Sequence, residues 1–231
     1  MRLDKHLHQC LGISRSQASQ LLRSGRITVN SAITKSGSLH VNEQDVILLD
    51  DNNLQKPGEN LYYFMLHKPQ GYVCANADAN HPGITQLFDI PQADELHAAG
   101  RLDVDTTGLV LVTNDGQWSH RVTSPRKQCD KTYRVWLADP VSDETSKLFA
   151  EGILLRSETQ PTRPAQLEIV TPCEVLLTIH EGKYHQVKRM FAAVGNHVER
   201  LHRERIGALN LDANLPEGSF RALTAEEISL F

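Results

Sequence analysis

The sequence predicts an α+β protein in which a small α/β module precedes a larger domain built on a mostly antiparallel sheet. The chain has 231 residues, which suits two domains of unequal size better than one or three. In its larger part, apolar runs of strand length outnumber helical patterns, and hairpin connections are frequent. A polar stretch at residues 51–60, which contains Pro57 and Gly58, is typical of a linker. It separates residues 1–50 from residues 61–231.

The first module is expected to contain two helices and two strands. Leucines recur every four residues from Leu3 to Leu11, which predicts a short amphipathic helix before Gly12. A capping box begins at Ser14 and predicts a second helix, which Gly25 ends. Short strands are expected at residues 26–30 and 45–50.

The larger domain is expected to mix strands with a few helices. The expected strands lie at residues 62–67, 109–113, 132–137, 165–171, 174–180, 197–203 and 206–211. The expected helices lie at residues 116–123, 142–151 and 184–194, and a last short helix follows Thr224. Only Pro172 and Cys173 separate two of the strand runs, which predicts an antiparallel hairpin at that point.

The charge of the chain is acidic overall but basic in patches. The formal net charge is −4. Residues 1–50 nevertheless carry six Lys/Arg against four Asp/Glu, residues 121–134 five against one, and residues 183–205 six against two. One such run is typical of a solvated face, but three favour binding to a polyanion such as nucleic acid. Arg15 and Arg23 share one side of the second predicted helix, and Arg26 follows it, which suits phosphate contacts.

Other features indicate a cytoplasmic protein without a membrane segment. The N-terminus has no apolar stretch of the kind found in a secretion signal, and no apolar run approaches the ~18 residues that cross a bilayer. The four cysteines are far apart and form no C-x-x-C pair. We therefore expect reduced thiols and neither a zinc site nor a disulfide framework.

Two aspartates, Asp103 and Asp105, lie in the segment "HAAGRLDVDTTGLVLV", before a buried strand. A Mg²⁺-dependent phosphohydrolase is disfavoured, because its D-x-D-x-T pattern follows a strand and here the strand comes after. A paired acid and base is disfavoured too, because Asp103 and Asp105 are not expected to converge on one bond. A structural turn is the expected role of Asp105.

The remaining alternative is a single catalytic carboxylate held by a cation. The segment "EGKYHQVKRMFAAVG" offers such a cation, because a helix beginning near Tyr184 would carry Lys188 on its first turns, beside Arg189. The same helix would turn Val187 and Phe191 inward. "KTYRVWL" places Tyr133 on a strand.

Together these segments resemble the pseudouridine synthases, in the branch that modifies ribosomal RNA. "GRLDVDTTGL" is similar to that family's G-R-L-D-x-x-T-x-G-L motif, "KTY" to its K-x-Y motif and "EGKYHQVKRM" to its third motif. The N-terminal "RLDKHL…SRSQASQLLRSGRITVN" resembles the small S4 RNA-binding module. The resemblance covers nearly the whole chain and implies an S4-like domain at 1–50, a linker at 51–60 and a synthase domain at 61–231.

The resemblance also implies roles for single residues. Asp103 takes the place of the catalytic aspartate, Tyr133 that of the tyrosine that stacks on the target base, and Lys188 that of the basic partner of the aspartate. Many relatives have arginine at that last position, and lysine cannot form a bidentate fork, so Arg189 is an alternative partner. Arg101 is expected to contact phosphate or to fill the space that the base vacates. The residues expected to bind RNA are Lys5, Arg15, Arg23, Arg26 and Arg189.

The implied reaction isomerises a specific uridine of 16S ribosomal RNA and needs neither a cofactor nor a metal. The expected partner is this RNA, naked or in an assembling ribonucleoprotein particle, and the enzyme is expected to be a monomer. The alternative is a non-catalytic ribosomal-RNA-binding or ribosome-assembly factor with the same N-terminal module.

Overall fold

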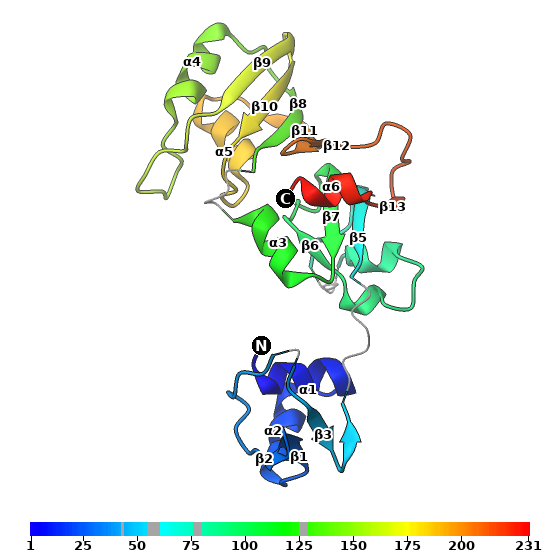
Figure 1. The fold of residues 1–231 in the computed structure, drawn as a ribbon. Coiled ribbons are helices and arrows are strands. Elements are labelled where there is room, and N and C mark those ends of the chain that lie inside the picture. Colours follow the sequence, from blue (N-terminus) through cyan, green and yellow to red (C-terminus); the bar gives the residue numbers. More distant parts are fainter. Residues whose placement is uncertain (43, 55–60, 76–79, 125–128) are drawn as a thin grey trace. The chain divides into compact units, whose positions relative to one another are not determined.

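The structure is a computed structural model that describes residues 1–42, 44–54, 61–75, 80–124 and 129–231 (Figure 1). The chain divides into two compact units, Met1–Asn60 and Leu61–Phe231. The predicted α+β class is confirmed. Part of the predicted linker, residues 55–60, and part of the second basic run, residues 125–128, lie outside the described residues.

The first unit packs two helices against a small sheet of order β2-β1-β3-β4. Its elements are α1 (Leu3–Leu11), α2 (Arg15–Arg23), β1 (Ile27–Val29), β2 (Ala32–Ile33), β3 (Ile47–Leu49) and β4 (Asn52–Asn53). The predicted capping box is present, because the Ser14 side chain accepts from the Gln17 backbone while the Gln17 side chain accepts from that of Ser14. Both helices contribute apolar residues, among them Leu3 and Leu22, to one core.

The predicted linker starts later than the sequence suggested. Asn52 and Asn53 pair with β3 as strand β4, and the backbone N–H of Leu54 donates to the Ile47 carbonyl at 2.8 Å. Leu54 also packs against the core of the first unit. Polar composition suggested a linker here, but a strand at the edge of a sheet can be polar because its pairing runs through the backbone.

The second unit is built on one large sheet, which within the described residues has the order β13-β5-β7-β11-β8-β10-β9, with β6 added to β7 and β12 to β11. Its strands are β5 (Tyr63–Lys68), β6 (His97–Ala99), β7 (Thr107–Thr113), β8 (Lys131–Leu137), β9 (Gln166–Thr171), β10 (Glu174–Ile179), β11 (Val198–Ile206), β12 (Leu209–Asn210) and β13 (Phe220–Ala222). Its helices are η1 (Ile84–Leu87), η2 (Ala93–Glu95), α3 (Gly116–Thr123), α4 (Asp143–Glu151), α5 (Gln186–Ala193) and α6 (Ala225–Ser229).

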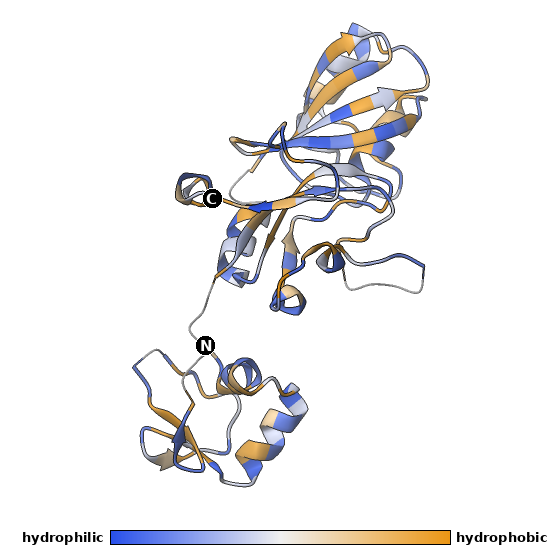
Figure 2. Cartoon of the chain, turned by 90° about the vertical axis from the view of Figure 1, so that its right-hand side faces the viewer, coloured by the Kyte–Doolittle hydropathy of each residue, from blue (hydrophilic) through white to orange (hydrophobic). Residues whose placement is uncertain are grey.

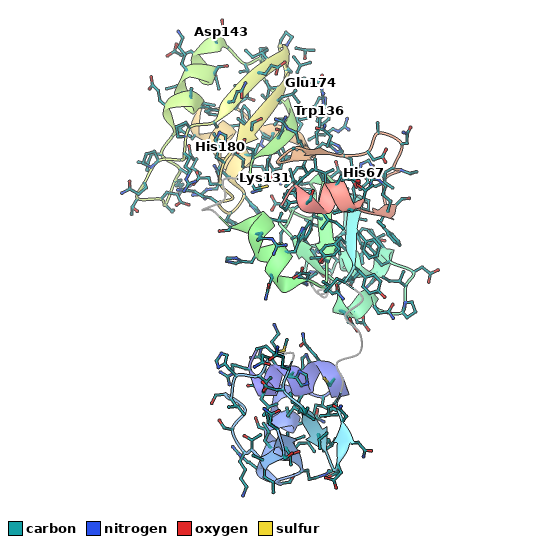
Figure 3. The ribbon with its side chains drawn as sticks, viewed as in Figure 1. His67, Lys131, Trp136, Asp143, Glu174 and His180 are labelled. Carbon is teal, nitrogen blue, oxygen red and sulfur yellow. The ribbon has the colours of Figure 1, made fainter. Side chains whose placement is uncertain are left out.

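The strand pairs of this sheet are antiparallel except for β7 with β11, as the sequence predicted for most of it. The expected hairpin is β9–β10. In the β8–β10 pair, Trp136 faces Glu174 near one end and Lys131 faces Ile179 at the other, beside His180 (Figure 3). Apolar residues are frequent along the strands, whereas most loops are hydrophilic (Figure 2).

The main core extends along the sheet from β5 and β7 to β8 and β10, where α4 and α5 contribute to it. Phe149 of α4 and Phe191 of α5 meet edge to face, with ring centroids 5.2 Å apart. Both rings are fully buried and share one cluster with Val135 and Leu177 of the strands beneath them. This packing fixes the N-terminal end of α5 relative to β8 and β10.

Several elements differ from the prediction in their bounds, and some were not predicted. The strands expected at 197–203 and 206–211 both form, but β11 continues to Ile206 and β12, after a turn at Gly207, has only two residues. The predicted helix at 184–194 begins only at Gln186, because His185 adopts a left-handed conformation with φ 47°. The short strands β6 and β13 were not predicted, since three residues are too few to show a period. None of the described helices combines the length and apolar character that a membrane crossing requires.

Candidate active site

The loop between β6 and β7 carries both aspartates. The Thr106 N–H donates to the Asp103 carbonyl at 3.1 Å, so residues 103–106 form a tight turn. This turn leaves the two side chains on the same side of the loop, where both approach Lys188. The expectation that Asp103 and Asp105 would not converge is therefore wrong, and even in an extended segment residues two apart lie on one face.

Lys68, at the end of β5, holds this loop in place. Its side chain is fully buried, and its Nζ donates to the carbonyl oxygens of Pro69 at 2.9 Å, Val104 at 3.4 Å and Thr106 at 2.8 Å. Burial lowers the pKa of the Lys68 amine, and the three carbonyls satisfy its donors. The sequence did not identify Lys68, because a lysine at the end of a strand usually lies in water.

Gly108 allows β7 and β11 to approach closely at the end of the loop. The two strands pair in parallel at His202–Thr107 and Arg203–Gly108. Gly108 has φ +107°, and a Cβ there would lie 2.3 Å from the Arg203 carbonyl oxygen. Only glycine can occupy this position without moving a strand. The contact brings Arg203 beside the loop that carries Asp103.

Lys188 and His185 approach the two carboxylates. The Lys188 Nζ lies 2.5 Å from Asp105 Oδ1 and 3.6 Å from Asp103 Oδ2, and His185 Nε2 lies 3.4 Å from Asp103 Oδ1. The sequence paired Lys188 with Asp103 and gave Asp105 a turn role. In the structure Lys188 is shared and its shorter contact is to Asp105. A lysine is a point charge, so one amine can serve two carboxylates.

The two aspartates differ in exposure. The Asp105 side chain is 52% exposed and that of Asp103 is 28% exposed. Burial raises the pKa of the Asp105 carboxyl, but the hydrogen bond and the charge of Lys188 outweigh it, so this pKa lies below its usual value. Asp103 is thus the carboxylate that is more shielded from water, while Asp105 takes much of the charge of Lys188.

Arg189 is occupied elsewhere. Its guanidinium contacts Glu158 Oε1 at 3.0 Å and the Arg156 carbonyl at 2.6 Å, and Lys183 Nζ contacts the other Glu158 oxygen at 3.2 Å. These contacts tie the connection between α4 and β9 to the start of α5. The alternative in which Arg189 replaces Lys188 beside Asp103 is not what the structure shows.

Tyr133 of β8 is buried beside Arg203. The Arg203 side chain is only 2% exposed, and it donates to the Tyr133 hydroxyl at 3.4 Å, with the ring centroid 5.9 Å from its guanidinium carbon. It also donates to the carbonyls of Leu109 at 2.8 Å, Gly100 at 2.9 Å and Arg101 at 3.4 Å. One buried arginine thus connects the strand of Tyr133 to the loop of Asp103. The sequence assigned Arg203 only to a basic run.

The predicted site residues meet at one cavity of about 100 Å³ between the loop and α5. Arg101, Asp103, Tyr133 and Lys188 all line it, as does His185. Val187, which the sequence placed inward on α5, forms part of the apolar wall. A flat, partly apolar ligand with polar edges suits such a cavity.

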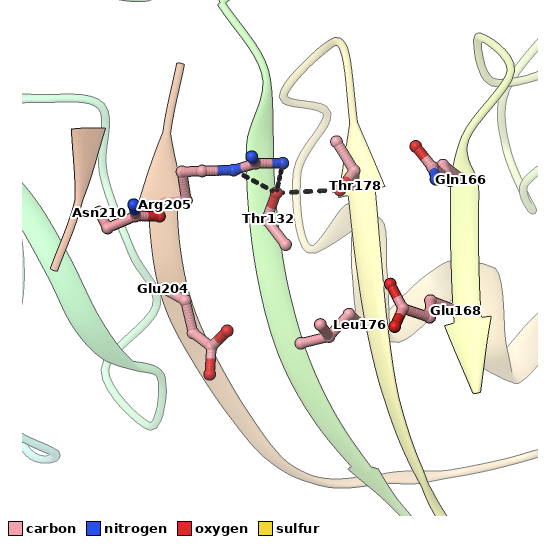
Figure 4. Close-up of a pocket in the computed structure, with 8 residues that line it drawn as sticks. All are labelled: Thr132, Gln166, Glu168, Leu176, Thr178, Glu204, Arg205 and Asn210. Carbon is pink, nitrogen blue, oxygen red and sulfur yellow. Dashed lines mark hydrogen bonds between the residues drawn. The ribbon is translucent and has the colours of Figure 1, made fainter. Parts of the chain in front are cut away.

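A larger hollow of about 280 Å³ lies on another face of the sheet (Figure 4). There Arg205 donates to the Thr132 hydroxyl at 3.2 and 3.0 Å, and this hydroxyl bonds that of Thr178 at 2.9 Å. These polar groups already satisfy one another, and the hollow lacks the predicted site residues. The smaller cavity is therefore the candidate active site.

The other predicted RNA-binding residues belong to the first unit. Lys5 lies on α1, and Arg15 and Arg23 are the first and last residues of α2. All three side chains are exposed. Arg26 is also exposed but pairs with Asp50, with its Nε 3.0 Å from Oδ1. Within the described ranges, no group of three or more His, Cys, Asp or Glu side chains is arranged to hold a metal ion.

Comparisons with known proteins point to one family. The RNA pseudouridylate synthase family model matches residues 62–193, and the S4 domain model matches residues 1–47. A ribosomal small subunit pseudouridine synthase A from Vibrio vulnificus (strain CMCP6) is 56% identical over 231 residues, 99% of this chain and 98% of that protein. The protein of the same name from Escherichia coli (strain K12) is 55% identical over 230 residues, 99% of each chain.

The fold also matches a solved structure. A structure described as a crystal structure of pseudouridylate synthase is similar with a TM-score of 0.75 and 54% identity, covering 100% of both chains. The likeness therefore extends over both units.

Proposed function

Because this chain belongs to the RNA pseudouridylate synthase family and is a pseudouridine synthase, we propose that it converts a specific uridine of 16S ribosomal RNA to pseudouridine, with Asp103 as the catalytic carboxylate. The name of the relatives, which specifies the small ribosomal subunit, supports the proposed substrate. The observation that supports the catalytic role is the meeting of Asp103, Tyr133 and Lys188 at one cavity.

The proposed reaction is balanced without any added group. The N1–C1′ bond of uridine breaks, the uracil turns, and C5 bonds to C1′. C5 gives up one proton and N1 receives one, so no atom, electron or net proton is gained. The cavity brings together the two charged groups that the proposed reaction uses, the Asp103 carboxylate and the Lys188 amine.

Asp103 must act as an anion in a site from which a bound base excludes water. Lys188 at 3.6 Å supplies an attraction of about 1 kcal/mol in water and about 4 kcal/mol at the effective dielectric of a protein surface. Both side chains are somewhat more than one quarter exposed in the free protein, so the attraction strengthens when a base closes the cavity.

Tyr133 is the proposed platform for the target base. Removing a nucleotide from its stack costs a few kcal/mol, and stacking on an aromatic ring returns about 1–3 kcal/mol. Arg203 fixes the Tyr133 ring through its hydroxyl, so the platform is ordered before the RNA binds. Arg101 is exposed at the cavity and is the proposed contact for a backbone phosphate.

The first unit is the proposed second contact for RNA. Lys5, Arg15, Arg23 and Arg26 expose positive charge on a domain that matches the S4 family. Phosphate contacts by such residues position a protein on RNA without reading its sequence. Since the whole chain carries a net charge of −4, binding depends on this local clustering and is expected to weaken steeply with salt.

The test compares two neighbouring aspartates on 16S ribosomal RNA transcribed in vitro. We expect Asp103→Asn to fold and bind this RNA but to form no pseudouridine. Asp105→Asn is the matched control, because it removes a carboxylate of the same loop and of the same lysine; it is expected to retain turnover at a reduced rate. Turnover of Asp103→Asn at the wild-type rate would show that the catalytic assignment is wrong. Wild-type protein that modifies only large-subunit RNA, or no RNA, would refute the substrate.

A further inference from the structure

Tyr184 is an exposed aromatic residue at the edge of the proposed catalytic cavity. Its side chain is 73% exposed, whereas Tyr133 is buried and the other tyrosines of the chain are half-buried. A single exposed apolar residue is ordinary. Tyr184 is unusual because it is the immediate neighbour of His185, which lines the catalytic cavity.

The rings of Tyr184 and His185 form a parallel stack. Their centroids are 3.8 Å apart and their planes differ by 20°. His185 Nε2 in turn lies 3.4 Å from Asp103 Oδ1. His185 therefore contacts the proposed catalytic carboxylate with one ring nitrogen and the exposed ring of Tyr184 with its face.

The backbone beneath this stack is fixed. Arg189 donates to the Tyr184 carbonyl at 3.1 Å, and the Lys183 N–H donates to the Gln186 side chain at 2.8 Å. His185 is held at φ 47° and ψ 36°, a conformation that residues other than glycine rarely adopt. A non-glycine residue kept in such a conformation beside an active site suggests that the position of its ring matters to the function.

The turn of Tyr184 has charged neighbours, since Lys183 and Arg189 both pair with Glu158. Arg156 lies against the same turn, since its carbonyl accepts from Arg189 at 2.6 Å. Its side chain is exposed. The exposed aromatic face of Tyr184 suits the stacking of a planar base.

We propose that Tyr184, ordered by its stack on His185, forms a second nucleobase-binding subsite that takes the base adjacent to the target uridine. This inference rests on the proposed function, because it assumes that the cavity receives a uridine within an RNA strand. Stacking is tolerant of base identity, so this subsite would hold the strand while the uridine leaves its stack, without reading sequence.

The first test uses kinetics on 16S ribosomal RNA transcribed in vitro. Tyr184→Ala is expected to raise KM about tenfold, which corresponds to about 1.4 kcal/mol of lost stacking, with kcat within about twofold of wild type. Tyr184→Phe keeps the ring and is expected to restore the wild-type KM. Leu154→Ala is the matched control, since Leu154 is also an exposed apolar residue of this unit, at 59%; it is expected to change nothing. A KM for Tyr184→Ala within twofold of wild type would overturn the proposal.

The second test couples the protein to the RNA. Once the modified uridine is mapped, an abasic nucleotide is placed on its 5′ or its 3′ side. For one of these RNAs we expect about a tenfold rise in KM with the wild-type enzyme and no further rise with Tyr184→Ala. If Tyr184→Ala raised KM by the same factor on both abasic RNAs as on unmodified RNA, the subsite would be refuted. Wild-type protein that forms no pseudouridine would instead refute the proposed function, so the two failures are distinguishable.

Discussion

Replacing Gly108 with alanine is expected to destabilise the catalytic unit by about 4 kcal/mol or more. A methyl group at this position would lie 2.3 Å from the Arg203 carbonyl oxygen and 2.6 Å from its backbone nitrogen. The φ of +107° itself costs an alanine about 1–3 kcal/mol. Relieving the clash requires β7 and β11 to separate, which leaves buried backbone groups unpaired at about 1–3 kcal/mol each.

The prediction can be measured by urea unfolding followed with tryptophan fluorescence. Both tryptophans, Trp118 and Trp136, lie in the second unit, so the signal reports on the catalytic unit alone. Gly116→Ala is the matched control, because a Cβ there meets nothing within 4 Å and the φ of Gly116 is not positive. Since alanine favours a helix more than glycine does, this variant is expected to raise the free energy of unfolding by up to about 1 kcal/mol. A loss below about 1 kcal/mol for Gly108→Ala would refute the close-approach argument.

Two further predictions concern the groups around this contact. The pKa of Asp105 is lower in the folded protein than its unfolded value of about 3.9, so wild type should be more stable than Asp105→Asn above about pH 4. This difference in stability should disappear as the pH falls below about 4. Because the Asp105 side chain is 52% exposed, the difference should stay below about 1 kcal/mol at any pH. Melting temperatures from pH 3 to 7 test this, and a difference that does not vary with pH would contradict it. Arg203→Lys is expected to lower the free energy of unfolding in urea by about 2 kcal/mol or more and to remove most turnover. One ammonium cannot reach the three carbonyls and the Tyr133 hydroxyl to which Arg203 donates. Wild-type kinetics for this variant would contradict the prediction.

The sequence predicted those features that depend on local spacing. The capping box at Ser14 and the leucine repeat of α1 satisfy groups within a few residues of one another, so their structure is encoded locally. The hairpin β9–β10 is of the same kind. Asp103, Tyr133 and Lys188 were identified because each lies in a short motif, although the three come from different parts of the chain.

The tertiary structure alone decided how these groups are paired. A turn brings both aspartates to the amine of Lys188, which lies nearer to Asp105 than to Asp103. The two sequence motifs do not specify these distances. Arg203 and Lys68 are buried cations bonded to carbonyls of the catalytic loop, yet in the sequence they are indistinguishable from surface charges. Their role arises when β5, β7 and β11 come together, and such long-range contacts leave no period or spacing in the chain.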